Sequence, residues 1–167
     1  MSYIDSNLLK SEKLIYFTRV HWIVFAMPAL FLLGTLLVAI FGDRLFRVPL
    51  PFLPISLSTL MTLICLGVTI LAGLDALIRY LTSEYGITNK RVLIKTGWIQ
   101  RNSLELFLRK VEAIYVDQSI LGRLFDYGTL RVVGTGGTQD PFFYIPNPLK
   151  FRRIAQQQVD KKNAGED

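Results

Sequence analysis

The chain has 167 residues, with 19 Lys and Arg against 13 Asp and Glu, and a formal net charge of +6. A single cysteine, Cys65, excludes an intramolecular disulfide, and a single histidine, His21, excludes a His-rich metal centre and leaves little for a His-based triad. The excess of positive charge favours anionic partners, but the basic residues are dispersed along the chain.

Residues 1–21 form an N-terminal arm of mixed polarity. About twenty polar or mixed residues precede the first apolar run, and no Ala-x-Ala site closes it, so it does not resemble a signal peptide and we expect the apolar runs to be retained. The apolar spacing of the arm predicts an amphipathic helix that lies on a bilayer surface. The positions that carry this pattern are Leu8, Leu9, Glu12, Leu14 and Ile15.

Two apolar runs follow, and residues 22–42 and 48–74 contain no Asp, Glu, Lys, Arg or His. Each run is long enough to cross a hydrocarbon core, which needs roughly 20 apolar residues. We therefore predict a two-helix transmembrane hairpin over residues 22–80, with spans at about 22–42 and 55–78. The connector contains Pro49, Pro51 and Pro54, which suit a non-helical turn.

Charges near the ends of the spans indicate the orientation. Asp75 and Arg79 lie four residues apart at the exit of the second span and are predicted to form an interfacial ion pair. The arm and the exit carry more Lys and Arg than the connector, which places both termini on the cytoplasmic side. The expected location is a membrane, with both termini on its cytoplasmic side, and a chain anchored there is not expected to bind nucleic acid.

From residue 82 onward the residue pattern is typical of short strands separated by turns. Residues 82–160 are predicted to form one small domain. No long helix interrupts the strands, so the sheets should be antiparallel. Asn147 and Pro148 then predict the start of a C-terminal helix, followed by a polar tail at residues 161–167. The expected strands are residues 85–88, 91–99, 104–108, 111–116, 130–133 and 142–145.

No motif in this domain indicates catalysis. The glycine-rich segment at residues 134–138 lacks the Gly-Lys-Ser/Thr ending of a phosphate loop, so a glycine-rich hairpin is the better interpretation. The acidic residues have no spacing that positions an acid and a base together. We expect a protein that is not an enzyme and that needs no metal or other cofactor.

A basic group lies on the first predicted hairpin. Its charges could form a solvated face, or they could contact anionic lipid head groups or a protein partner. Trp98 follows on the same hairpin and could pack in the core or touch the membrane or a partner. The candidate binding residues are Lys90, Arg91, Lys95, Trp98 and Arg101.

Several blocks between residues 82 and 155 resemble the bacterial pleckstrin-homology-like (PH-like) domains of small membrane proteins. The blocks are residues 85–99, 106–114, 118–132, 134–137 and 145–148. The resemblance implies two packed antiparallel sheets capped by a C-terminal helix, with turns at Gly97, Gly122 and Gly128. The side chains expected to fill this sandwich are Val92, Ile94, Leu106, Leu108, Val111, Ile114 and Val132.

Two functions fit these observations. The first is a membrane-anchored, non-catalytic binding or scaffold module that presents a cytoplasmic surface to a protein partner or a second copy, with anionic head groups as a further contact. The second is an accessory subunit of a membrane transport or envelope-stress complex. In that case Thr69 with Gly73, and Ala72 with Ala76, would let other helices approach closely.

Overall fold

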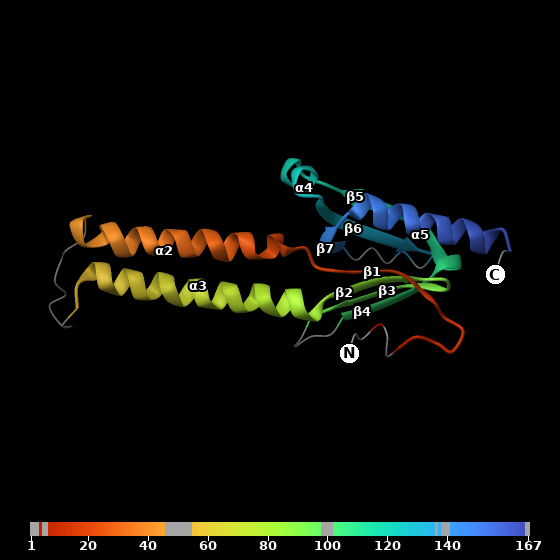
Figure 1. Cartoon of the computed structure of the whole chain (residues 1–167), viewed down its shortest axis with the longest axis horizontal. Helices are drawn as coiled ribbons and strands as arrows, with labels where there is room; N and C mark the ends of the chain where they lie inside the picture. The colour runs from red at the N-terminus through yellow and green to blue at the C-terminus, as the bar shows by residue number, and fades with distance from the viewer. Residues whose placement is uncertain are drawn as a thin grey trace. The chain divides into compact units, whose positions relative to one another are not determined.

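The computed structural model describes residues 4, 7–45, 55–97, 102–135, 137 and 141–165. Two units are distinguished, Met1–Ile23 with Arg79–Asp167 and Val24–Ile78, and each is described by itself (Figure 1). The helices are η1 (Trp22–Phe25), α2 (Ala26–Leu45), α3 (Leu57–Thr82), η2 (Leu108–Lys110), α4 (Ile120–Leu124) and α5 (Pro148–Asn163). The strands are β1 (Leu14–Arg19), β2 (Glu84–Thr88), β3 (Arg91–Thr96), β4 (Asn102–Phe107), β5 (Val111–Asp117), β6 (Tyr127–Gly134) and β7 (Pro141–Pro146).

The N-terminal arm contributes the first strand of the larger sheet, whose order is β1-β2-β3-β4. The amphipathic helix predicted for the arm is therefore wrong. Burial alternates along β1, and Tyr16 turns its ring edge to Phe151 with centroids 5.9 Å apart. Aromatic and β-branched residues at a period of two favour a strand over a helix. The compact unit consequently includes the arm as well as the predicted domain at 82–160.

The second sheet has the order β5-β6-β7, and all its pairs are antiparallel, as are those of the first sheet. Strand β6 alternates between half-buried and buried residues along its whole length. Such an alternation means that one face of the strand covers a core. The antiparallel two-sheet arrangement predicted from the sequence is confirmed among the described residues.

Helix α5 closes the domain by packing against η2, β5 and β6 (Figure 1). Phe151 and Ala155 on its inner face are fully buried. Pro148 is the first helical residue, as predicted, but Asn147 does not cap the helix through its side chain. The reason is that Asn147 has a left-handed backbone (φ 48°), whereas a capping side chain normally comes from an extended residue.

The predicted core is mostly confirmed. Val92, Ile94, Leu108, Ile114 and Val132 are buried, and only Leu106 and Val111 remain half-buried. Further buried residues complete this core. They include Tyr85, Ile87, Leu130, Ile145 and Phe151.

The unit Val24–Ile78 contains α2 and most of α3. Two helical segments, Trp22–Arg44 and Leu57–Thr82, are long and apolar enough to cross a membrane by length and composition. Thr35 and Thr69 meet between α2 and α3 with their hydroxyl oxygens 3.0 Å apart, and Ser58 donates a hydrogen bond to Asp43. The predicted connector prolines, Pro49, Pro51 and Pro54, lie outside the described residues.

Candidate functional site

Both predicted spans interrupt the domain at one point, between β1 and β2. These strands pair antiparallel, and Arg19 lies opposite Glu84 at the end of the pair. Only Val20 and His21 separate β1 from η1, and only Ser83 separates α3 from β2. The chain therefore leaves the sheet and returns to it at the same end, which we call the span-side end of the domain.

The strand register divides the predicted basic group between opposite ends of the sheet. Lys95 pairs with Glu84, so it lies at the span-side end. Arg91 begins β3 at the other end of the sheet, about 13 Å away at 3.3 Å per residue, and Lys90 directly precedes it. Trp98 and Arg101 lie outside the described residues.

Arg91 is buried in an ion cluster instead of facing solvent. Its side chain is only 9% exposed, and its guanidinium donates from Nε to Oε1 and from Nη2 to Oε2 of Glu12, both at 2.9 Å. Nη1 donates to Glu105, and Nη2 also donates to the carbonyl of Asn7 at 2.8 Å. This bidentate geometry is the strong form of an Arg–carboxylate pair.

Glu12 brings the arm into the same cluster. Its side chain is fully buried, and its carboxylate also accepts hydrogen bonds from the Thr88 hydroxyl at 2.7 Å and from the Leu9 amide at 3.0 Å. Burial disfavours ionisation of Glu12, but the hydrogen bonds from Arg91, Leu9 and Thr88 outweigh it, so its pKa is lowered. The pKa of Arg91 is raised, because the hydrogen bonds to Glu12 outweigh burial.

The cluster gives Arg91 a structural role, since its charge is already neutralised by two carboxylates. Further bonds join the arm to the turn after β2. The Lys13 amide donates to Asn89 Oδ1 at 2.9 Å, and Lys90 Nζ donates to the Ser11 hydroxyl. Two members of the predicted basic group, Lys90 and Arg91, therefore hold the arm on the sheet.

A second surface lies on the short helix α4, between β5 and β6. Its side chains are strongly exposed, at 87% for Ile120, 58% for Leu121 and 74% for Leu124. Positions i, i+1 and i+4 lie on one face of a helix, so these three side chains form one apolar surface. We call this set, Ile120, Leu121 and Leu124, the α4 patch.

Helix α4 is held firmly against the start of β6. The Gly122 amide donates to the Ser119 hydroxyl at 3.0 Å, and Gln118 Nε2 donates to the carbonyls of Gly122 and Tyr127. A Cβ on Gly122 would lie 2.6 Å from the Tyr127 carbonyl oxygen, so no larger residue fits there. The α4 patch is thus a rigid feature of the domain.

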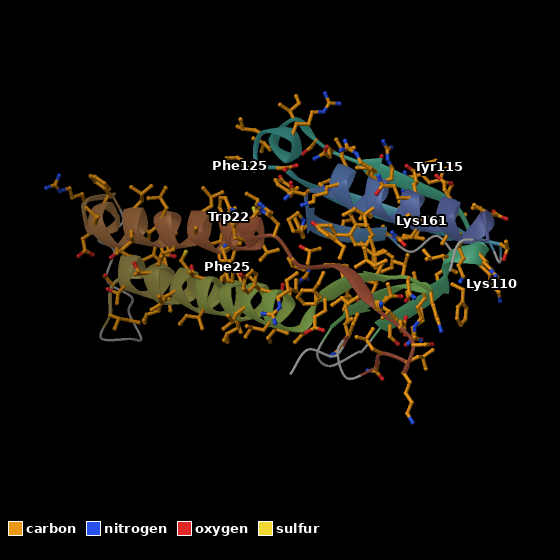
Figure 2. All side chains as sticks on the ribbon, turned by 45° about the vertical axis from the view of Figure 1, so that its right-hand side comes forward. Trp22, Phe25, Lys110, Tyr115, Phe125 and Lys161 are labelled. Carbon is orange, nitrogen blue, oxygen red and sulfur yellow. The ribbon has the colours of Figure 1, made fainter. Side chains whose placement is uncertain are left out.

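Aromatic contacts place α4 at the span-side end. Trp22, the first residue of the first candidate span, meets Phe125 edge to face with ring centroids 5.9 Å apart (Figure 2). His21 stacks on Tyr127 at 5.5 Å, and its amide donates to the Tyr144 carbonyl at 2.7 Å. Burial lowers the pKa of His21, opposed by the charge of Asp126 and a hydrogen bond with the Phe125 backbone.

The remaining predicted pair, Asp75 and Arg79, lies on α3 at the predicted spacing, and its ion pair stays a prediction. Among the residues that the structure describes, no group of three or more His, Cys, Asp or Glu side chains could hold a metal ion.

Sequence reasoning missed Glu12 and the α4 patch. Nothing in local spacing connects Glu12 to Arg91, which is 79 positions away. For the patch a signal exists, because three large apolar residues occur within a segment too short to bury them.

Comparison with known families identifies one match. Residues 25–159 match the bacterial PH domain, so the match begins after β1, within the first candidate span, and contains the whole of the second. No curated protein sequence matches the chain.

Proposed function

The chain belongs to the bacterial PH domain family, and from that premise we propose that it is a membrane-anchored, non-catalytic binding or scaffold module. The PH-like domain would present its surface on the cytoplasmic side of the bacterial cytoplasmic membrane to a protein partner or a second copy. Anionic lipid head groups would be a further contact at the span-side end.

The observation that carries this proposal is the insertion of both candidate spans between β1 and β2. Only Val20 and His21 link β1 to η1, and only Ser83 links α3 to β2. These links are short, because one extended residue spans at most about 3.6 Å. A domain tied through two adjacent strands stays close to any bilayer that the spans cross. Its partners are then molecules found at that surface.

Exposure of the apolar side chains supports a bilayer around α2 and α3. Leu36, Ile40, Ile64 and Leu71 are each more than half exposed within the chain. A soluble protein rarely leaves so much contiguous apolar surface uncovered. Lipid acyl chains would cover it without leaving backbone groups unpaired, because helices satisfy these groups internally.

Charge supports the orientation and the lipid contact. Arg19 and Lys95 lie at the span-side end of the larger sheet, and positive residues near span ends favour the cytoplasmic side. Each Lys or Arg near an anionic surface contributes about 1 kcal/mol of attraction. We therefore assign the head-group contact to Lys95 and not to Lys90 and Arg91. Trp98 and Arg101 stay candidates from the sequence alone.

The accessory-subunit alternative is favoured by one observation on α3. A Cβ added to Gly67 or to Gly73 would meet no atom within 4 Å, so the helix surface is open at both positions. Helices of other membrane proteins pack closely at such small residues. In this case the spans would themselves bind a partner instead of serving only as an anchor.

Two measurements test the proposal. The chain should remain in the membrane fraction after extraction with alkaline carbonate, and release into the supernatant would contradict membrane anchoring. Affinity purification from detergent-solubilised membranes should then recover a stable protein partner or a second copy. If the partner is retained by a variant without the PH-like domain, the accessory-subunit alternative is supported.

The lipid contact has a matched control on the same strand pair. Lys95→Glu should reduce the anionic lipid that co-purifies with the full chain, measured by native mass spectrometry. Lys90→Glu changes the same charge at the opposite end of the sheet and should have little effect. Equal lipid retention by both variants and the unmodified chain would remove lipid contact from the proposal.

A further inference from the structure

We propose that α4 inserts its patch into the interfacial region of the bilayer and so forms a third membrane contact beside the two spans. This inference rests on the proposed membrane anchoring and extends it. The α4 patch would lie among the upper acyl segments of the cytoplasmic leaflet, and the PH-like domain would then have one fixed orientation at the surface.

The α4 patch is entirely apolar and exposed. Ile120, Leu121 and Leu124 carry no polar atoms in their side chains, and Ile120, at 87%, is the most exposed large apolar residue in the described part of the domain. Caps and hydrogen bonds hold α4 in this position, so the exposure is built into the fold. An amphipathic helix with one apolar face is typical of segments that lie in a membrane interface.

The residue that follows α4 contacts the start of the first candidate span. Trp22 begins the first candidate span and contacts the Phe125 ring, which directly follows α4 (Figure 2). Tryptophan is enriched at the boundary between hydrocarbon and water. If Trp22 lies at that boundary, the residue in contact with it lies at the same depth, and the adjoining patch can reach the acyl chains.

The charges around the patch also favour a lipid surface. Arg123 is the one charged residue of α4 and is exposed between apolar neighbours, where its long side chain can extend to a head group. Asp126 lies at the end of the turn that follows α4. Asp117 lies before α4, at the end of β5, and forms an ion pair with Arg131 at 2.8 Å. A single cation among three apolar side chains fits a lipid surface better than an acidic protein groove.

The full chain in nanodiscs of phosphatidylcholine and phosphatidylglycerol provides the test. Cys65 is the only cysteine, so Cys65→Ser gives a background for one added label. Leu124→Cys and Ile120→Cys, each labelled with an NBD fluorophore, report on the patch independently. Leu36→Cys reports on the first span, and Lys110→Cys reports on an exposed position at the other end of the second sheet.

We expect NBD at residues 120 and 124 to be quenched several-fold more by lipids with nitroxides on the upper acyl chain than NBD at residue 110. Aqueous iodide should show the opposite order. Iodide quenching at residues 120 and 124 equal to that at residue 110 would overturn the proposal. So would a blue-shifted signal that neither quencher reaches, because a protein partner or a second copy would then cover the patch.

The label at residue 36 distinguishes failure of the α4 insertion from failure of the membrane anchoring. Lipid quenching there together with water exposure at residues 120 and 124 would reject only the insertion of α4. Loss of lipid quenching at residue 36 would reject the membrane anchoring itself.

Discussion

Arg19 and Glu84 lie opposite each other in the β1–β2 pair, although both candidate spans lie between them in the chain. The apolar helices are therefore an insertion into a sheet and not an N-terminal anchor followed by a separate domain. This arrangement makes folding of the domain depend on residues from both sides of the spans, since β1 precedes them and the other strands follow.

The insertion predicts that the spans can be removed if the strand pair is kept. Joining Arg19 to Glu84 through an Asn-Gly turn should give a folded, soluble domain, because a two-residue turn closes directly opposed antiparallel strands. The measurement is the dispersion of amide signals in a ¹⁵N–¹H NMR spectrum. The comparison is residues 82–167 alone, which lack β1 and Glu12.

We expect this shorter fragment to unfold at a lower denaturant concentration or to aggregate, because β2 then becomes an unpaired edge. The shorter fragment also lacks Glu12, the carboxylate to which Arg91 donates two hydrogen bonds. Equal stability of the two proteins would show that the arm is dispensable for the fold.

The buried cluster predicts a large effect for Arg91→Ala. This change leaves the fully buried Glu12 without a cation, which should cost about 3–5 kcal/mol in the free energy of unfolding. Chemical denaturation of the span-free fusion measures the effect. Arg131→Ala removes the cation of an exposed pair with Asp117 and should cost less than about 1 kcal/mol. Similar losses in both variants would contradict the structural role of Arg91.

Glu12 also predicts how the stability of the domain depends on pH. Its folded pKa is lowered, so its stabilising contribution is complete above the unfolded value, about 4.3 for Glu. The contribution is lost as the pH falls through the lower folded pKa, because protonation removes the charge that Arg91 binds. Unfolding midpoints measured from pH 7 to pH 3 should fall steeply at the acidic end.

The Glu12→Gln variant should be less stable at pH 7, and its unfolding midpoint should change less between pH 7 and pH 3. If the variant keeps the full acidic dependence, another carboxyl group causes it.

Gly122 predicts a packing effect at α4. Gly122→Ala places a Cβ within 2.6 Å of the Tyr127 carbonyl oxygen, where backbone cannot move aside easily. The expected cost is about 1–3 kcal/mol in the free energy of unfolding, which is typical of overpacking. Gly73→Ala in the full chain is a control, because a Cβ there has open space. A neutral result for Gly122→Ala would show that α4 is held less firmly than its hydrogen bonds indicate.

The candidate sites were only partly predictable. Arg91 and Lys95 lie on one predicted strand and Lys90 directly precedes it, and this spacing does not tell which end of the sheet each occupies. The register with β2 puts Lys95 at the span-side end. Arg91 is buried because Glu12 approaches it from the arm, and no local pattern encodes a partner so distant in sequence.

The sequence by itself determined the two apolar helices, the antiparallel sheets, the C-terminal helix and most of the core. These features follow from the length of the two runs without charged residues and from local hydrophobic periodicity. Both properties are defined by residues close together in the sequence. The tertiary structure decided that the arm contains strand β1, that the spans are inserted into the domain, that Arg91 is an internal ion and that Phe125, the residue after α4, contacts Trp22. Each of these depends on pairing between residues far apart in the chain, and such pairing is selected by the packing of the whole domain.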